Sequence, residues 1–246
     1  MLLSHYLFST CLSWATTRYT SDHGYHLGEW RIPAHKCQPY ETDLRVPFLV
    51  RGPGVARNAT LRRDAVVGLN VDIAPTIAAM AGVSPGPEAR LDGRSLLPAL
   101  LGLGAGAGAG AAAAAAAGAA APPPPRTEFT FEYWGNDLRP EHPSPQLLKC
   151  GNPMGHWLDA KNNTWLGLRV LNGTHDLKYL QAEDDHNTTE FFDLAADPFE
   201  LTNLMATPQG RARAAPLAAK LAAYRGCGLG PMGAATNTGA TGVPCP

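Results

Sequence analysis

Residues with metal-binding and anion-binding chemistry gather in a short polar segment, residues 20–54. Asp22 and His23 are adjacent, and Lys36 lies fourteen residues after Asp22. A carboxylate oxygen and an imidazole nitrogen are donors to a divalent cation, and a lysine ammonium can hold an anion beside that cation. The pattern predicts metal-assisted hydrolysis of an ester of a tetrahedral oxyanion. An Asx turn uses the same Asp-His-Gly residues for local hydrogen bonds, so these residues alone leave both interpretations open.

Two strands should flank this segment and position it. The first should end at residues 20–21 and deliver Asp22 and His23 to the loop beyond its C-terminal edge, where open α/β sheets bind ligands. Residues 46–51 form an apolar run that ends at Gly-Pro-Gly. This run predicts a buried strand.

Charged residues near these strands are expected to shape the backbone. Glu41, Asp43 and Arg45 precede the second strand, and we expect them to form a local ion-pair network that orients the loop. Asp72 is expected to cap a helix that ends at Gly82.

The later part of the chain has a different pattern. A Gly/Ala/Pro low-complexity insert occupies residues 102–125, and such a composition predicts a spacer without catalytic residues. Four strands and then one amphipathic helix are expected beyond it, at 127–133, 165–171, 176–182, 189–194 and 211–224. Strands followed by a helix indicate an α+β unit.

Several motifs in collinear order resemble one family. They are SDHGYHLG and PYETDLRVPFLVRGPG around the polar segment, NVDIAPTI at 70–77, LDGRSLLP at 91–98 and FDLAADP at 192–198. From about residue 19 to about residue 224 the chain resembles the sulfatase family. Within that family it is most similar to the branch of glucosamine-6-sulfatases and heparan-sulfate 6-O-endosulfatases.

The resemblance implies a fold and a division into domains. It implies the C-terminal part of an α/β, alkaline-phosphatase-like sandwich followed by a small α+β subdomain with an antiparallel sheet. The expected segments are an unassigned N-terminus that is either signal-like or a gene-model artefact, the sandwich part, the insert, the subdomain and a Gly-rich tail, at 1–18, 19–101, 102–125, 126–226 and 227–246.

The resemblance also implies roles for four residues. Asp22 would be a ligand of Ca²⁺, and His23 would be a second ligand or a hydrogen-bond partner of the bound sulfate. Lys36 resembles the family lysine that pairs with a sulfate oxygen. His26 is the candidate acid for the leaving alkoxide. The implied activity is sulfuric ester hydrolysis on sulfated glycans or aryl sulfates.

One family motif is missing from this sequence. Sulfatases of this kind carry Cys-x-Pro-x-Arg, whose cysteine or serine becomes formylglycine, and none of the five cysteines here stands in that context. The N-terminal aspartate pair of the family is absent as well. The sequence therefore predicts an incomplete sulfatase chain that lacks its nucleophile.

Two other functions remain open from the sequence. A phosphatase or phosphonate hydrolase of the same superfamily shares Asp-His metal ligation, but generally binds two zinc ions and lacks the pattern from Lys36 to Glu41. A non-catalytic secreted protein could instead bind sulfated glycans with a remnant site.

Asn-x-Ser/Thr sequons and charge bear on the compartment and the partners. The four sequons, which predict glycosylation in a secretory pathway, are at Asn58, Asn162, Asn172 and Asn187. Together with the secreted or lysosomal location that the family resemblance implies, the sequons predict an extracellular, cell-wall or lysosome-like location. A net charge of −1 argues against nucleic-acid partners, and no window predicts a membrane span. The family resemblance implies that Cys227 and Cys245 pair. The oligomeric state is not predicted.

Overall fold

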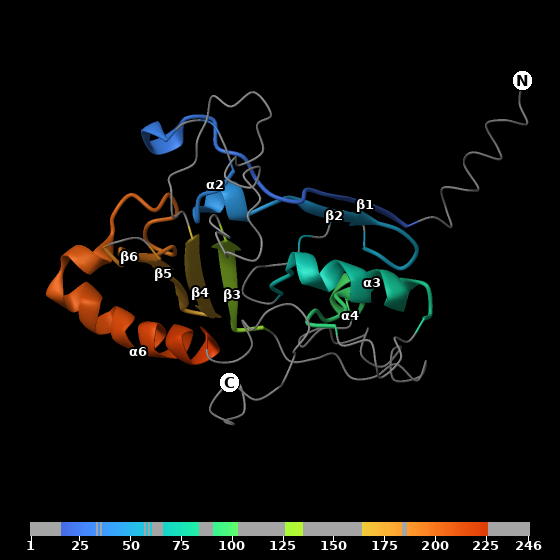
Figure 1. Cartoon of the computed structure of the whole chain (residues 1–246). Coiled ribbons are helices and arrows are strands. Elements are labelled where there is room, and N and C mark those ends of the chain that lie inside the picture. The colour runs from blue at the N-terminus through green and yellow to red at the C-terminus, as the bar shows by residue number, and fades with distance from the viewer. Residues whose placement is uncertain are drawn as a thin grey trace, which may run out of the picture. The chain divides into compact units, whose positions relative to one another are not determined.

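The computed structural model describes residues 16–32, 34, 36–56, 58, 60, 66–83, 91–102, 126–134, 164–183 and 186–225. Two compact units share the chain (Figure 1). The first unit takes residues 1–22 and 46–126, and the second takes residues 23–45 and 127–246. The loop that carries His23 and Lys36 therefore groups with the later unit, and the boundary falls between Asp22 and His23.

The first unit contains a two-stranded antiparallel sheet. Strand β1 (Thr17–Thr20) pairs with β2 (Phe48–Arg51), with Thr20 opposite Phe48. Strand β2 begins after Pro47, which has no N–H to donate to a ladder. The strand predicted at 46–51 is confirmed as β2, but its predicted burial is wrong, because Leu49 is 62% exposed. Among the described residues the sheet has no third strand, so part of the apolar surface stays uncovered.

Asp72 organises the helical part of the first unit. The 3-10 turn η2 (Asn70–Asp72) leads directly into helix α3 (Ile73–Met80), and a short helix α4 (Leu97–Leu100) follows. Asp72 precedes α3 as predicted, and the helix stops before Gly82, whose φ is 68°. The Asp72 side chain does not cap α3, however. It accepts from Leu69 N at 2.8 Å, Arg94 N at 2.8 Å and both terminal nitrogens of Arg126.

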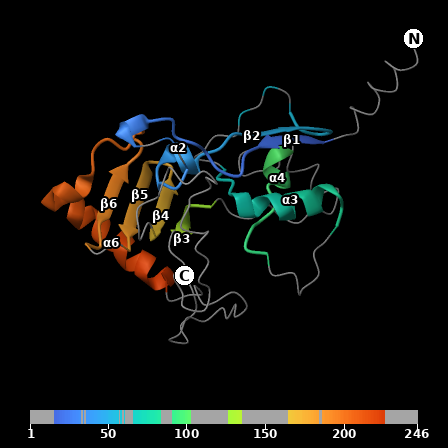
Figure 2. The ribbon, with the colours of Figure 1, turned by 45° about the horizontal axis from the view of Figure 1, so that its top comes forward.

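The second unit is a four-stranded antiparallel sheet with one long helix. The predicted strands are confirmed as β3 (Glu128–Trp134), β4 (Thr164–Asn172), β5 (His175–Ala182) and β6 (Thr189–Asp193), in that spatial order. The 3-10 turn η3 (Leu204–Ala206) precedes helix α6 (Pro208–Arg225). The helix starts earlier than the predicted 211, because Thr207 Oγ1 caps it by accepting from Gly210 N at 3.0 Å. Figure 2 shows α6 running along the sheet.

The two faces of this sheet have different partners. Helix α6 supplies Ala214, Leu217 and Leu221 to an apolar core with strand residues such as Phe191. The next residue along the strand, Phe192, points to the opposite face and packs in a separate cluster with Tyr40 from the loop 23–45. The four-stranded sheet therefore lies between α6 and the loop that carries the candidate site residues. No helix in the described part of the chain is long and apolar enough to cross a membrane.

Candidate functional site

His23 and Lys36 lie in direct contact. Lys36 Nζ is 2.6 Å from His23 Nε2, and His23 Nδ1 is 2.7 Å from the main-chain oxygen of Gly24. A carbonyl oxygen only accepts, so Nδ1 carries the imidazole proton and Nε2 accepts from the lysine ammonium. The pair is therefore a neutral histidine and a charged lysine, both half-buried.

Asp22 lies at the end of the segment that follows β1. Its side chain is exposed, and Oδ1 is 3.4 Å from Ser21 Oγ. Its main-chain oxygen accepts from Asn70 Nδ2 at 2.9 Å. Asn70 therefore holds the peptide after Asp22, a role that sequence reasoning missed although the residue opens the motif at 70–77.

Asp43 closes the loop between His23 and Lys36. Its Oδ1 is 2.7 Å from His26 Nδ1, its Oδ2 accepts from Gln38 N at 2.8 Å, and its main-chain oxygen accepts from Gly24 N at 2.7 Å. One buried residue thus bonds to both arms of the loop. This clamp explains how residues thirteen positions apart come into contact.

The helix that carries Asp43 presses tightly on the loop. Helix α2 (Glu41–Leu44) passes so close to Gly24 that an added Cβ would lie 1.9 Å from Thr42 O. Only glycine fits there without moving the backbone. The peptide next to His23 is therefore fixed by α2 through contact as well as through hydrogen bonds.

His26 is 1% exposed, and its Nδ1 pairs with Asp43 Oδ1 at 2.7 Å. Sequence reasoning assigned it to the leaving group and did not foresee the buried His-Asp pair. The structure gives this histidine a part in closing the loop. Its action as an acid stays a prediction.

Cys37 fixes the residue next to Lys36 to the sheet. Its sulfur is in a disulfide and accepts from Tyr133 Oη at 3.3 Å. Its main-chain oxygen accepts from Trp165 Nε1 at 3.1 Å. Lys36 is therefore attached to the sheet through its neighbour. The predicted Cys227–Cys245 disulfide lies outside the described residues and stays a prediction.

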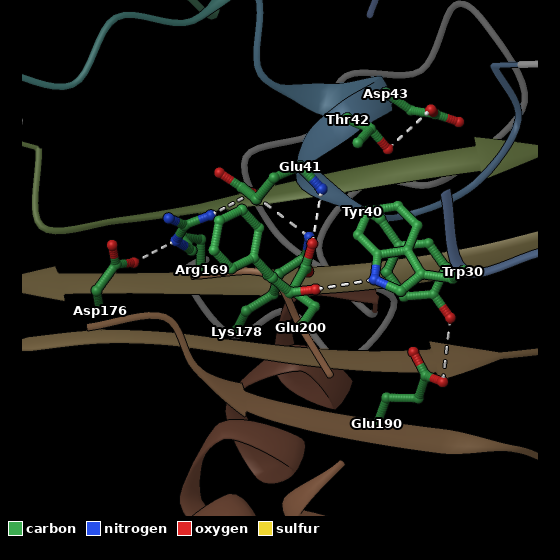
Figure 3. Close-up of polar contacts among 11 residues, drawn as sticks. Trp30, Tyr40, Glu41, Thr42, Asp43, Arg169, Asp176, Lys178, Glu190 and Glu200 are labelled. Atoms are coloured by element: carbon green, nitrogen blue, oxygen red, sulfur yellow. Dashed lines mark hydrogen bonds and ion pairs between the residues drawn. The ribbon is translucent and has the colours of Figure 1, made fainter. Parts of the chain in front are cut away.

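A second anchor of the loop is an ion-pair cluster on the sheet, shown in Figure 3. The cluster comprises Glu41, Arg169, Asp176, Lys178 and Glu200. Arg169 binds Glu41 Oε1 at 2.6 Å through Nη1 and Asp176 Oδ1 at 2.5 Å through Nε. Lys178 is 0% exposed and binds Glu200 Oε1 at 2.6 Å. The predicted local network around Glu41 is therefore wrong in one respect, since its partners come from distant strands.

Glu200 joins this cluster to the backbone of α2. Its Oε2 accepts from Glu41 N at 2.7 Å, while Oε1 receives Lys178. Glu200 has φ 56°, in the left-handed region that non-glycine residues rarely adopt. Such a conformation costs about 1 to 3 kcal/mol and persists only where other contacts impose it. The neighbouring Phe199 is 68% exposed, so this backbone turns Glu200 inward while Phe199 faces out.

The turn around Glu200 also contacts the loop through Trp30. Trp30 Nε1 donates to Phe199 O at 3.1 Å, and the Trp30 and Tyr40 rings lie 5.3 Å apart. The two acids of the turn have different roles. Asp197 stabilises the turn itself, since its Oδ2 accepts from Thr202 N at 2.8 Å. The side chain of Glu200 binds Lys178 in the ion-pair cluster instead.

The pKa values of the carboxyl groups in and beside the cluster are shifted in different directions. Burial opposes ionisation of Glu41, but Arg169 and Lys178 outweigh that cost and lower its pKa. Burial raises the pKa of Glu200, and its bond to Lys178 offsets only part of that. Nearby, burial also raises the pKa of Glu190, which accepts from Tyr40 Oη at 3.3 Å. Glu200 and Glu190, the two carboxyls with a raised pKa, lie on the same side of the sheet as the loop.

The described residues supply only part of a metal site. No group of three or more His, Cys, Asp or Glu side chains suited to a metal occurs among them. Asp22 and His23 provide at most three donor atoms, whereas Ca²⁺ takes six to eight oxygen ligands. In this geometry His23 Nε2 is also engaged by Lys36. A complete calcium site does not fit these residues alone.

The predicted glycosylation sites are partly visible. Asn58 and Asn187 are exposed, with φ of 53° and 48°. Asn172 ends β4, and Asn162 lies outside the described residues. The two visible loop positions are accessible for modification.

Comparison with known proteins identifies similar sequences. Residues 15–83 match the family model Sulfatase. The chain is 34% identical to N-acetylglucosamine-6-sulfatase of Homo sapiens over 194 residues, which are 77% of this chain and 31% of that protein. It is 52% identical to an extracellular sulfatase SULF-1 homologue of Drosophila melanogaster over 83 residues, 34% of this chain and 7% of that protein.

The fold of this chain is similar to that of a solved protein. It is a protein in complex with its substrate D-glucosamine-2-N,6-O-disulfate, with a TM-score of 0.58 and 25% identity. The match covers 89% of this chain and 35% of the other. This confirms the predicted fold class. The chain spans about a third of the length of the curated N-acetylglucosamine-6-sulfatases it matches.

Proposed function

Because this chain belongs to the sulfatase family, we propose that it carries part of the active site of a sulfuric ester hydrolase that acts on sulfated glycans. One observation carries the proposal. The charged Lys36 is held against a neutral His23 at 2.6 Å by a loop that Asp43 closes. A fixed ammonium of this kind suits a tetrahedral oxyanion.

Lys36 would hold an oxygen of the sulfate group. Its ammonium has three N–H donors and donates one of them to His23, so two can bind an anion. Negative charge grows on the sulfate and the ester oxygen as the ester bond breaks, and a positioned cation stabilises that charge. His23 keeps the ammonium oriented, because its Nε2 lone pair is fixed by the Nδ1 bond to Gly24 O.

Asp22 and His23 are the residues of this chain proposed to contribute to a metal site. The family implies a metal ion, and calcium is our proposal for its identity. When bound, the ion would neutralise charge on the sulfate oxygens. Asp22 is exposed, and His23 would have to exchange Lys36 for the metal in order to ligate it. The formylglycine nucleophile has no motif in this sequence, and the remaining ligands would come from outside the described residues.

Two similar proteins support a proposal for the substrate class. One is an N-acetylglucosamine-6-sulfatase, and the other is a solved protein in complex with its substrate D-glucosamine-2-N,6-O-disulfate. We propose a sulfated glucosamine unit of a glycan as substrate.

We also propose a secretory-pathway location, with N-linked glycans attached to Asn58 and Asn187. An intact-mass difference before and after glycan removal tests the last point, and no difference in a secreted sample would contradict it.

The test of function is hydrolysis by a complete enzyme that contains these residues. Glucosamine-6-sulfate should be cleaved, the matching 6-phosphate much more slowly, and Lys36→Ala should abolish most of the turnover. Preference for the phosphate would favour the phosphatase alternative.

A non-catalytic glycan-binding protein is the second candidate, since the ammonium of Lys36 that His23 orients could bind a sulfate group without hydrolysing its ester. It predicts that the 246-residue chain binds sulfated but not desulfated glycan, releases no sulfate, and loses binding in Lys36→Ala.

A further inference from the structure

We infer that Glu200, from the small α+β subdomain, is a positioning residue for Lys36. Its carboxylate fixes helix α2, and α2 in turn fixes the loop that brings Lys36 onto His23. The inference rests on the proposed function, since it assigns Lys36 to the sulfate. The subdomain therefore takes part in positioning Lys36, although Glu200 lies far from Lys36 in the sequence.

The first link joins Glu200 to α2. Glu200 Oε2 accepts the Glu41 N–H at 2.7 Å, which is one of the N-terminal N–H groups of a helix that have no partner within the helix. This bond grips the backbone of α2, so side-chain rotation of Glu41 cannot release it. Lys178, wholly buried, holds the other carboxylate oxygen at 2.6 Å and sets the direction of the first.

The second link joins α2 to the two arms of the loop. Asp43, two residues after Glu41, bonds to Gly24 and His26 on one arm and to Gln38 on the other. Gly24 adjoins His23, and Gln38 is two residues from Lys36. A shift of α2 along the sheet would pull the Gly24 arm and His23 with it, while Cys37 keeps the Lys36 arm on the sheet through Trp165. The 2.6 Å contact between Lys36 and His23 would therefore open.

The strained backbone at Glu200 supports a dedicated contact. A buried glutamate with φ 56° points its side chain at Glu41 N and Lys178 although its backbone is unfavourable. Trp30 stabilises the same turn by donating to Phe199 O at 3.1 Å. Two contacts of the turn, to Glu41 N and from Trp30, end on the loop 23–45, so the turn and the loop form one positioning assembly.

A matched pair of double variants separates positioning from stability. Lys178→Met with Glu200→Gln removes both charges but keeps an acceptor for Glu41 N. Lys178→Met with Glu200→Leu removes the charges and the acceptor at similar volume. Replacing a buried ion pair with apolar groups is often neutral for stability, so both should fold. Glu128→Gln is the control, because Glu128 also accepts two bonds, from Lys220 and Tyr224, but does not bond the loop.

The first readout is the imidazole ¹⁵N spectrum of the 246-residue chain. The Nε2 signal of His23 should stay at its wild-type position in the Gln variant and in Glu128→Gln, and should move in the Leu variant. Unchanged His23 signals in a folded Leu variant would overturn the inference whether or not the protein is a sulfatase.

The second readout is turnover by a complete enzyme that contains these residues. The Leu variant should lose about tenfold or more in kcat, since a displacement near 1 Å can cost up to a hundredfold, and the Gln variant should stay within about threefold. In a Lys36→Ala background the difference between the two variants should vanish. A difference that persists there would refute positioning through Lys36. Absence of sulfate-ester hydrolysis in the wild type would count against the proposed function alone.

Discussion

The two faces of the four-stranded sheet are held by different forces. On one face the contact of α6 is mainly apolar, through Ala214, Leu217 and Leu221, and partly exposed bonds to Glu128 from Lys220 and Tyr224 add to it. On the other face the loop 23–45 packs Tyr40 near Phe192, and it is also held by ion pairs to Arg169 and Lys178 and by hydrogen bonds from strand side chains. Apolar contacts are non-directional, whereas charge-assisted hydrogen bonds fix distance and angle. The helix face supplies stability, and the loop face supplies position.

Removing one partner of the buried ion pair should have the largest effect on stability. Lys178→Met leaves Glu200 buried without its cation and should lower the free energy of unfolding by about 3 to 5 kcal/mol near neutral pH. Adding Glu200→Gln should recover much of the loss. Urea denaturation of the three proteins measures both steps. A single variant as stable as the wild type would show that Lys178 is not buried as described.

Shortening a residue on the helix face tests the other half of the comparison. Leu221→Ala should cost about 3 kcal/mol, because it removes a fully buried side chain from the α6 core. The same variant should leave the His23 ¹⁵N signals unchanged at temperatures where it is folded. A shift of those signals would mean that the helix face also positions the loop.

Removing Lys36, which lies in the loop 23–45, tests whether this lysine takes part in catalysis. Lys36→Ala in a complete enzyme should lower kcat by about a hundredfold, which is about 2.7 kcal/mol of transition-state stabilisation. Stability should change little, since Lys36 is only half-buried. Steady-state kinetics and a thermal melt measure the two quantities. A loss below about threefold would indicate that the lysine does not touch the sulfate.

The smallest effect should be a pH dependence at Glu190, which lies on the loop face. Burial raises the pKa of Glu190 above 4.5, so its contribution to stability is full below that value and is lost as pH rises through the folded-state pKa. Glu190→Gln should therefore gain stability relative to wild type between pH 4 and pH 7. Denaturation at both pH values measures this. A relative stability that falls over that range would contradict the assignment.

Parts of this structure were accessible from the sequence because they depend on local pattern. The four strands and the helix of the second unit follow from alternation and helical spacing. Asp72 was placed before α3, but its side-chain partners Arg94 and Arg126 were not foreseen. Strand 46–51 was expected to be buried, but Leu49 is exposed, since burial depends on neighbours that the run itself does not encode.

By itself the sequence determined which residue types stand at Asp22, His23, Lys36 and Asp43, and with them the chemistry available. Only the tertiary structure decided that Lys36 meets His23, and that Glu200 holds the helix that brings them together. Those contacts join residues up to 159 positions apart. Local propensities act over a few residues, so partners at that separation are chosen by packing and by the burial of charge.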